Sequence, residues 1–185
     1  MAPTILPGER VLVHKMAYDL KVPFLDIPIV QWADPARGDL VVFRAPDGKL
    51  RLKRVIGLPG DVLEMRRNRL VVNGEDAQYE PCGPEDHEAL GFEPPPRAKV
   101  LYERLGKKRY PVIWFGMPGS DFAPFEVPEA HYFVLGDNRN RSRDSRWFGP
   151  VSRNSITAQV TAVVLSFDRE NGFSPRWKRF FLSLP

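Results

Sequence analysis

Nineteen prolines, spread along a chain of 185 residues, constrain its fold more than any other feature of the sequence. Proline lacks a backbone N–H and clashes with the preceding turn, so it breaks any helix in whose interior it falls. Few stretches between these prolines show apolar residues at helical spacing. Hydrophobic residues nevertheless make up 43% of the chain, which is enough for a buried core. We therefore expect a folded protein that is mostly β.

Short runs of apolar and β-branched residues predict where the strands lie. The expected strands cover residues 10–15, 39–43, 49–56, 131–135 and 156–167. Residues 62–65 and 70–72 are expected to form a hairpin that is closed by the turn signal Asn73-Gly74.

The sequence changes character between about residues 79 and 130, where prolines separate short apolar stretches. Aromatic residues continue through this segment, which argues against a flexible linker. We interpret residues 79–130 as an inserted β-rich subdomain, and residues 1–78 and 131–185 as the core into which it is inserted.

Charge and cysteine content exclude several classes of function. The net charge of +4 is spread through interleaved acidic and basic residues, so no concentrated basic stripe predicts binding to nucleic acid. Cys82 is the single cysteine, and His14, His87 and His131 lack the spacing of metal ligands. No apolar run reaches the ~18 residues that would span a bilayer. We therefore expect either a soluble protein or one whose anchor lies outside this sequence.

Four segments carry more information than these patterns. They are Met1-Ala-Pro-Thr-Ile-Leu-Pro-Gly-Glu-Arg-Val-Leu-Val, Arg37-Gly-Asp-Leu-Val-Val-Phe, Leu52-Lys-Arg-Val-Ile-Gly-Leu-Pro-Gly-Asp and Leu135-Gly-Asp-Asn-Arg-Asn-Arg-Ser-Arg-Asp-Ser-Arg-Trp-Phe-Gly. Together, and in this order, they resemble the sequence boxes of bacterial type I signal peptidases, the leader peptidases. The match covers about residues 1–61 and 131–152. It implies a peptidase with a coiled antiparallel β-sheet core.

The resemblance assigns catalytic roles to Lys53 and Ser142. In this family a lysine amine is the general base, and a lysine can act as a base near neutral pH only if burial lowers its pKa. Lys53 lies in an expected strand among apolar residues that could supply such a surround. Ser142 matches the serine that hydrogen-bonds and orients the lysine. Four further residues match the groups that support the site: Arg54, Asp137, Asp144 and Arg146.

The nucleophile of the family is the serine directly before the Met-x-Pro-Thr segment, and this sequence opens with that methionine. We expect the nucleophilic serine, and a membrane anchor upstream of it, to precede Met1 in a longer chain. The alternative is a relative without peptidase activity, a module of the same fold that binds signal peptides or a membrane partner. A second rival is another serine/lysine peptidase, such as a self-cleaving repressor or a conjugation-system peptidase.

The resemblance further implies that the enzyme removes signal peptides from exported preproteins at the outer, periplasmic side of the cytoplasmic membrane. Small side chains one and three residues before the cut would fit shallow apolar pockets. We interpret five residues as candidate pocket walls: Met1, Pro3, Ile5, Val41 and Phe43. The expected partners are signal peptides and the lipid surface. We expect a monomer that needs no metal or organic cofactor.

Overall fold

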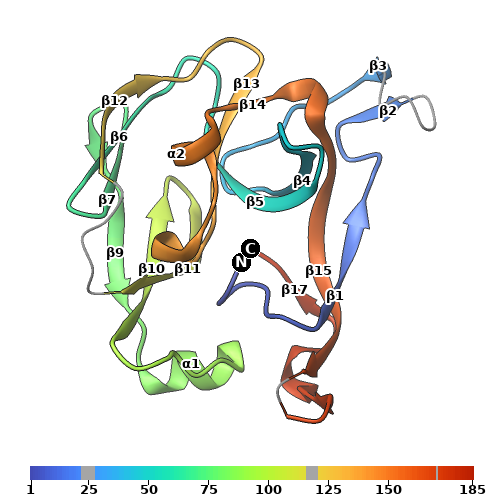
Figure 1. The fold of residues 1–185 in the computed structure, drawn as a ribbon, viewed down its shortest axis with the longest axis vertical. Coiled ribbons are helices and arrows are strands. Elements are labelled where there is room, and N and C mark those ends of the chain that lie inside the picture. Colours follow the sequence, from blue (N-terminus) through green and yellow to red (C-terminus); the bar gives the residue numbers. More distant parts are fainter. Residues whose placement is uncertain (22–27, 116–120, 170) are drawn as a thin grey trace.

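The computed structural model describes residues 1–21, 28–115, 121–169 and 171–185, and within these ranges the fold is mostly β (Figure 1). Every ladder between its named strands is antiparallel in these ranges. The expected fold class is therefore confirmed.

The largest sheet has the strand order β1-β15-β4-β5-β13-β14, and two short strands, β16 and β17, also pair with β15. Figure 1 shows β15 as the long strand that runs down one side of the molecule. The strands of this sheet are β1 (Glu9–His14), β4 (Leu40–Arg44), β5 (Leu50–Gly57), β13 (His131–Leu135), β14 (Val151–Ser152), β15 (Ile156–Asp168), β16 (Ser174–Pro175) and β17 (Leu182–Ser183). All five single strands that the sequence predicts thus belong to one sheet.

Three smaller sheets complete the described fold. The first has the order β11-β10-β9, the second β12-β6-β7-β8, and the third is the pair β2-β3. Their strands are β2 (Asp19–Lys21), β3 (Pro28–Gln31), β6 (Val62–Arg66), β7 (Arg69–Val72), β8 (Glu75–Asp76), β9 (Gln78–Pro81), β10 (Ala98–Leu105), β11 (Lys108–Phe115) and β12 (Phe122–Glu126).

The predicted hairpin of β6 and β7 is present, but its turn is not the one that the sequence suggested. Arg67 and Asn68 close it, with positive φ angles of 50° and 65°. Such paired positive φ angles match the right-handed twist of hairpin strands. Asn73 and Gly74, with φ angles of 53° and 84°, instead join β7 to β8. Both dipeptides form turns. The prediction that Asn73-Gly74 closes the hairpin of β6 and β7 was wrong, because this dipeptide forms the next turn along the chain.

The segment 79–130 packs into the same core as the residues that flank it in the sequence. Tyr110 and Val112 on β11 are buried in one apolar cluster with Ile56 of β5 and Leu135 of β13. Residues 116–120 of this segment lie outside the described residues. The division into an inserted subdomain and a core stays a prediction, and the shared cluster shows how closely the two parts are joined.

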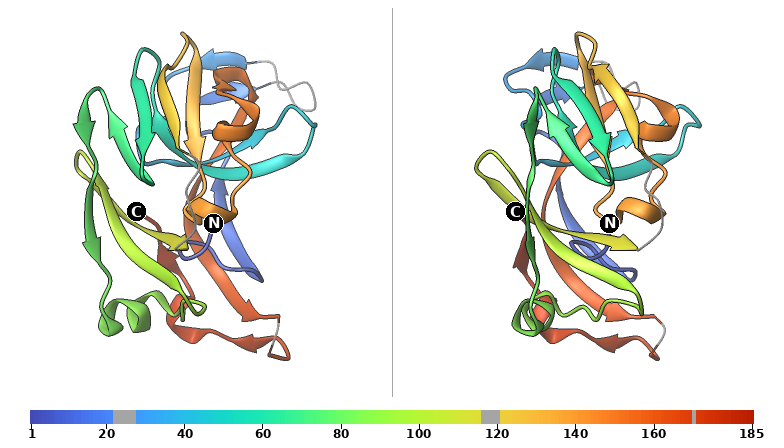
Figure 2. Two further views of the ribbon diagram at one scale, coloured as in Figure 1. Left: turned by 60° about the vertical axis from the view of Figure 1, so that its left-hand side comes forward. Right: turned by 90° about the vertical axis from the view of Figure 1, so that its left-hand side faces the viewer.

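Helices are short and few in the described residues. The α-helices are α1 (Pro84–Leu90) and α2 (Ser145–Phe148), and the 3-10 turns are η1 (Arg139–Arg141), η2 (Arg153–Ser155) and η3 (Trp177–Arg179). Among the residues that the structure describes, none of these is long and apolar enough to cross a membrane. Figure 2 shows α1 and the lower end of β15 at one end of the molecule. Both chain termini lie at mid-height.

Candidate active site

Lys53 lies on β5, one residue before the point where β5 begins to pair with β13. Its ladder partner on β4 is Val41, whereas the ladder to β13 starts at Arg54, opposite Leu135. Lys53 is half-buried and forms no ion pair or hydrogen bond with the described residues. Burial lowers the pKa of its amine below the usual lysine value, and the carboxylates of Asp144 and Asp137 only partly oppose this effect.

Ser142 and Lys53 approach each other over the backbone of Gly136, the residue that follows β13. A Cβ atom on Gly136 would lie 2.7 Å from Ser142 Cβ and 3.3 Å from Lys53 Nζ, so a side chain here would collide with the serine. Gly136 is therefore required for close approach of these two side chains. Ser142 Oγ is buried and has no hydrogen-bond partner among the described residues. An unsatisfied buried hydroxyl next to a desolvated amine is an uncommon arrangement in a folded protein.

Asp144 fixes the loop that carries Ser142. Its Oδ2 accepts a hydrogen bond of 3.0 Å from the backbone N–H of Gly136. Arg146 donates to both carboxylate oxygens of Asp144, at 2.8 Å each, and also donates to the carbonyl of Arg139 at 2.6 Å. The carboxylate also caps the start of α2. Asp144 thus holds both Gly136 and the start of α2 in place.

Asp137 and Arg54 form a second support, and both side chains are fully buried. Arg54 Nε and Nη2 donate to the two oxygens of Asp137 at 3.0 and 2.9 Å. Thr4 also donates to Asp137, and the guanidinium of Arg54 lies 4.0 Å from the ring centroid of Tyr110. This pair connects β5, the loop after β13 and the first residues of the chain.

The first residues of the chain lie beside the same groups. Burial lowers the pKa of the Met1 α-amino group below its usual value; the charge of Asp137 raises it, and the charge of Lys53 lowers it. The Met1 backbone nitrogen is therefore close enough to Lys53 for their charges to interact.

The six residues that were assigned to the site or its support meet at this place, namely Lys53, Arg54, Asp137, Ser142, Asp144 and Arg146. Their chemical roles stay predictions. The five candidate pocket walls are spread more widely. Met1 and Ile5 are half-buried and Pro3 is buried. Val41 and Phe43 have no exposed surface, because their side chains belong to a core cluster. Neither of these two side chains offers surface to a ligand in this structure.

Sequence reasoning missed a buried charge pair next to the site. Arg139 donates to both oxygens of Glu103 at 2.5 and 2.7 Å, and Tyr79 and Tyr110 each donate to Glu103 at 2.7 Å. Glu103 lies on β10, whereas Arg139 precedes Ser142 in the same loop. The pair thus ties the segment 79–130 to that loop. Arg139 lay inside a recognised segment, but no local signal marked Glu103.

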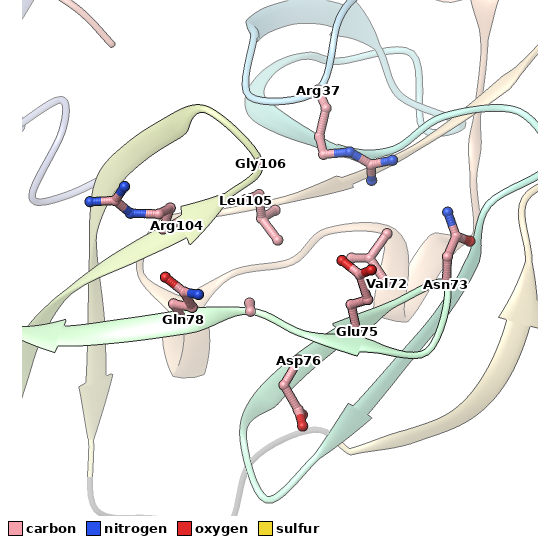
Figure 3. Close-up of a pocket in the computed structure, with 10 residues that line it drawn as sticks. Arg37, Val72, Asn73, Glu75, Asp76, Gln78, Arg104, Leu105 and Gly106 are labelled. Carbon is pink, nitrogen blue, oxygen red and sulfur yellow. The ribbon is translucent and has the colours of Figure 1, made fainter.

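A hollow elsewhere on the molecule, which none of the six site residues lines, offers a contrast to the surroundings of Lys53 (Figure 3). It has a volume of about 420 Å³ and lies where β7 and β8 approach β10, with Arg37 and Arg104 among its lining residues. Arg37 already pairs with Asp61 at 2.8 Å, and Arg104 with Glu80 at 3.5 Å. Its cations are thus engaged by carboxylates, unlike Lys53.

Comparisons with known proteins place the chain in one family. Residues 1–165 match the family model described as signal peptidase, peptidase S26. Signal peptidase I of Pseudomonas fluorescens is 36% identical over 185 residues, and that of Pseudomonas aeruginosa is 38% identical over 184 residues. Each alignment covers 90% of this chain and 62% of the relative, so the chain spans less than two thirds of these relatives' length. A solved structure of a signal peptidase I from Enterococcus faecalis is 30% identical, with a TM-score of 0.43, over 69% of this chain and 97% of that one.

Proposed function

The chain belongs to the signal peptidase family, peptidase S26, and from this premise we propose that it forms the catalytic domain of an endopeptidase that removes signal peptides from exported preproteins. One observation carries the proposal. The desolvated amine of Lys53 and the unpartnered hydroxyl of Ser142 meet over Gly136, where a side chain on that residue would separate them.

We assign the general base to Lys53. A neutral amine accepts the proton of a serine hydroxyl as the serine oxygen attacks the scissile carbonyl. The protonated amine then gives the proton to the leaving amino group, and the acyl-enzyme remains. In the second half of the reaction the same amine takes a proton from water as the water attacks the ester, and gives that proton to the serine oxygen as it leaves. Ser142 Oγ, which has no other described partner, would orient the amine by a hydrogen bond.

We place the nucleophilic serine directly before Met1. A residue joined to the Met1 nitrogen would lie beside Lys53, because the charge of Lys53 already acts on that nitrogen. The serine nucleophile and the lysine base would then lie on opposite sides of one short gap.

We place the signal peptide along the free edge of β5. On one side β5 pairs with β4 from Leu50 to Arg54, but on the other side the ladder to β13 begins only at Arg54. The β13-facing edge of residues 50–53 is therefore open within the described fold, and it ends at Lys53. An extended peptide could add to it as a strand. Leu50, which is 61% exposed, supplies apolar surface there.

We place this domain at the outer surface of the cytoplasmic membrane, as a monomer. The support is a group of exposed aromatic residues near the carboxyl end, Phe173, Trp177 and Phe181, whose exposed fractions are 65%, 71% and 76%. Aromatic side chains next to Lys178 suit the interface between lipid and water.

The test adds a short segment that ends in serine before Met1, and a matched segment that ends in alanine. We expect the serine form to cleave a purified preprotein at the end of its signal peptide and the alanine form to leave it intact. Mass spectrometry of both products locates the cut. If both forms bind the preprotein and neither cleaves it, the domain is a binding module of the same fold. If neither form binds it, the proposal is wrong.

A further inference from the structure

A larger cavity than the hollow of Figure 3 is lined by sequence neighbours of the site residues, among them Ala2, Asn138 and Arg141. Its volume is about 700 Å³, and Ile113 and Phe115 of β11 supply apolar lining. Arg141 and Arg169 are also among its lining residues. We call it the Arg169 groove, defined by Ala2, Ile113, Phe115, Asn138, Arg141 and Arg169.

Two lining residues of the Arg169 groove, Ala2 and Asn138, are close in the sequence to residues of the candidate site. Ala2 follows Met1, whose nitrogen feels the charge of Lys53, and Asn138 lies two residues after Gly136. Oδ1 of Asn138 is buried and has no hydrogen-bond partner among the described residues, so an acceptor is available at this end. A peptide N–H is the kind of donor that would satisfy it.

Some of the elements that line the groove lie on the opposite side of the N-terminus from β5. In Figure 1 and in both views of Figure 2, β5 lies above the N-terminus, whereas α1 and the lower end of β15 lie below it. Lining residues of the groove come from the segment after α1 and from the end of β15. A polypeptide that is cut in its middle must leave the scissile bond in two directions. If one arm pairs with β5, the groove is available for the other.

The groove is lined by more positive than negative side chains. Arg176 is paired with Asp168 at 3.1 Å. Arg141 lies 4.3 Å from the ring centroid of Phe115, and within the described part of the chain neither Arg141 nor Arg169 forms an ion pair. Glu93 is the one lining carboxylate that remains, so the unpaired charges leave an excess of one positive charge.

We propose that the Arg169 groove binds the first residues of the mature protein, beyond the cut, and favours acidic over basic side chains there. The proposal rests on the proposed function, because it assigns the second arm of the same substrate. Apolar lining would hold the extended chain, and Arg141 and Arg169 would select its charge.

The test measures peptide binding to the 185-residue chain, so it does not depend on cleavage. Two labelled peptides share the signal-peptide side and differ only at the third residue after the cut, which is glutamate in one and lysine in the other. Fluorescence anisotropy at low salt should show the glutamate peptide binding about threefold to tenfold more tightly. The preference should decrease as salt is added.

Arg169→Glu should abolish or reverse this preference, whereas Arg66→Glu should not change it. Both arginines are exposed, and Arg66 on β6 does not line the groove. Circular dichroism checks that both variants are folded. Tight binding of both peptides with no preference, or a preference that Arg169→Glu leaves unchanged, would overturn the groove assignment alone. Failure of both peptides to bind would overturn it together with the proposed function.

Discussion

Lys53 and Arg54 are neighbours on β5, and their surroundings differ in the one respect that decides their chemistry. Arg54 is fully buried and has a carboxylate, a carbonyl and an aromatic ring around its guanidinium. Lys53 is half-buried and forms no ion pair or hydrogen bond with the described residues. A carboxylate partner favours the charged form of a buried cation, whereas burial without such a partner favours the neutral form of an amine.

Arg54 and four other arginines that are buried or largely buried share this pairing. Each has a carboxylate partner within 3.0 Å; the pairs are Arg54–Asp137, Arg139–Glu103, Arg146–Asp144, Arg153–Asp19 and Arg179–Glu9. The fold thus pairs these arginines and leaves the lysine amine unpaired. This difference supports the proposal that Lys53 transfers protons.

The largest effect should come from removing the unpaired amine. In the form with serine before Met1, Lys53→Met should lower the rate of preprotein cleavage about ten-thousandfold, because no other base lies in its place. Unfolding by urea should show unchanged or higher stability, because a desolvated charge has been removed. Lys49→Met, at an exposed position just before β5, is the control and should keep its activity. Cleavage by Lys53→Met at a normal rate would exclude Lys53 as the base.

A slightly smaller effect, on stability, should come from unpairing a buried arginine. Glu103→Gln leaves the charge of Arg139 buried without a carboxylate and should lower the free energy of unfolding by about 3–5 kcal/mol. Glu64→Gln breaks the pair of Glu64 with Arg66, whose side chain is 68% exposed, and should change the free energy of unfolding much less. Urea unfolding of both variants gives the comparison. Equal losses would mean that burial does not distinguish the two pairs.

The sequence predicted the strands better than the site. Alternating and β-branched residues located β1, β4, β5, β13 and β15 within one or two residues. For β4, β5, β13 and β15 the reason is that apolar side chains are buried in the core, whereas Leu12 and Val13 of β1 are exposed. The hairpin of β2 and β3 and the helix α1 were not predicted. The apolar residues of β2 and β3 are largely exposed, as Ile29 and Val30 show, so their pattern does not report burial.

The site itself was predicted only through the resemblance of whole segments. By spacing alone, Lys53 lies between two arginines and Ser142 lies in a turn. Glu103 could not be predicted at all, because its partner Arg139 is 36 residues away and no local period connects them. Pairings of this kind are set by how sheets pack, and packing is a property of the tertiary fold.

Ser142→Ala should produce a moderate effect on catalysis and none on stability. Loss of the hydroxyl should lower kcat up to about a hundredfold, because the amine is no longer oriented, and KM should change little. Stability should not fall, because Ser142 Oγ has no described partner to lose.

Ser145→Ala provides the matched comparison with Ser142→Ala. Its hydroxyl oxygen accepts a buried hydrogen bond of 2.9 Å from Val134 N–H, so its removal should destabilise the fold by about 1–3 kcal/mol. A loss of stability in Ser142→Ala that equals the loss in Ser145→Ala would make Ser142 a structural residue of the turn.

The smallest effect is a dependence of stability on pH that comes from Lys53. The pKa of Lys53 is lowered in the folded chain, so between that value and its usual value the unfolded chain binds more protons. Stability contributed by this group must therefore rise with pH across that window and level off above it, with a slope of at most about 1.4 kcal/mol per pH unit for one proton. In urea unfolding measured from neutral to alkaline pH, Lys53→Met should make this rise smaller, whereas Lys49→Met should leave it unchanged. The Met1 α-amino group, whose pKa is also lowered, contributes a rise of its own in both variants. A rise of equal size in Lys53→Met and Lys49→Met would mean that the Lys53 amine is charged in the fold as an ordinary lysine is.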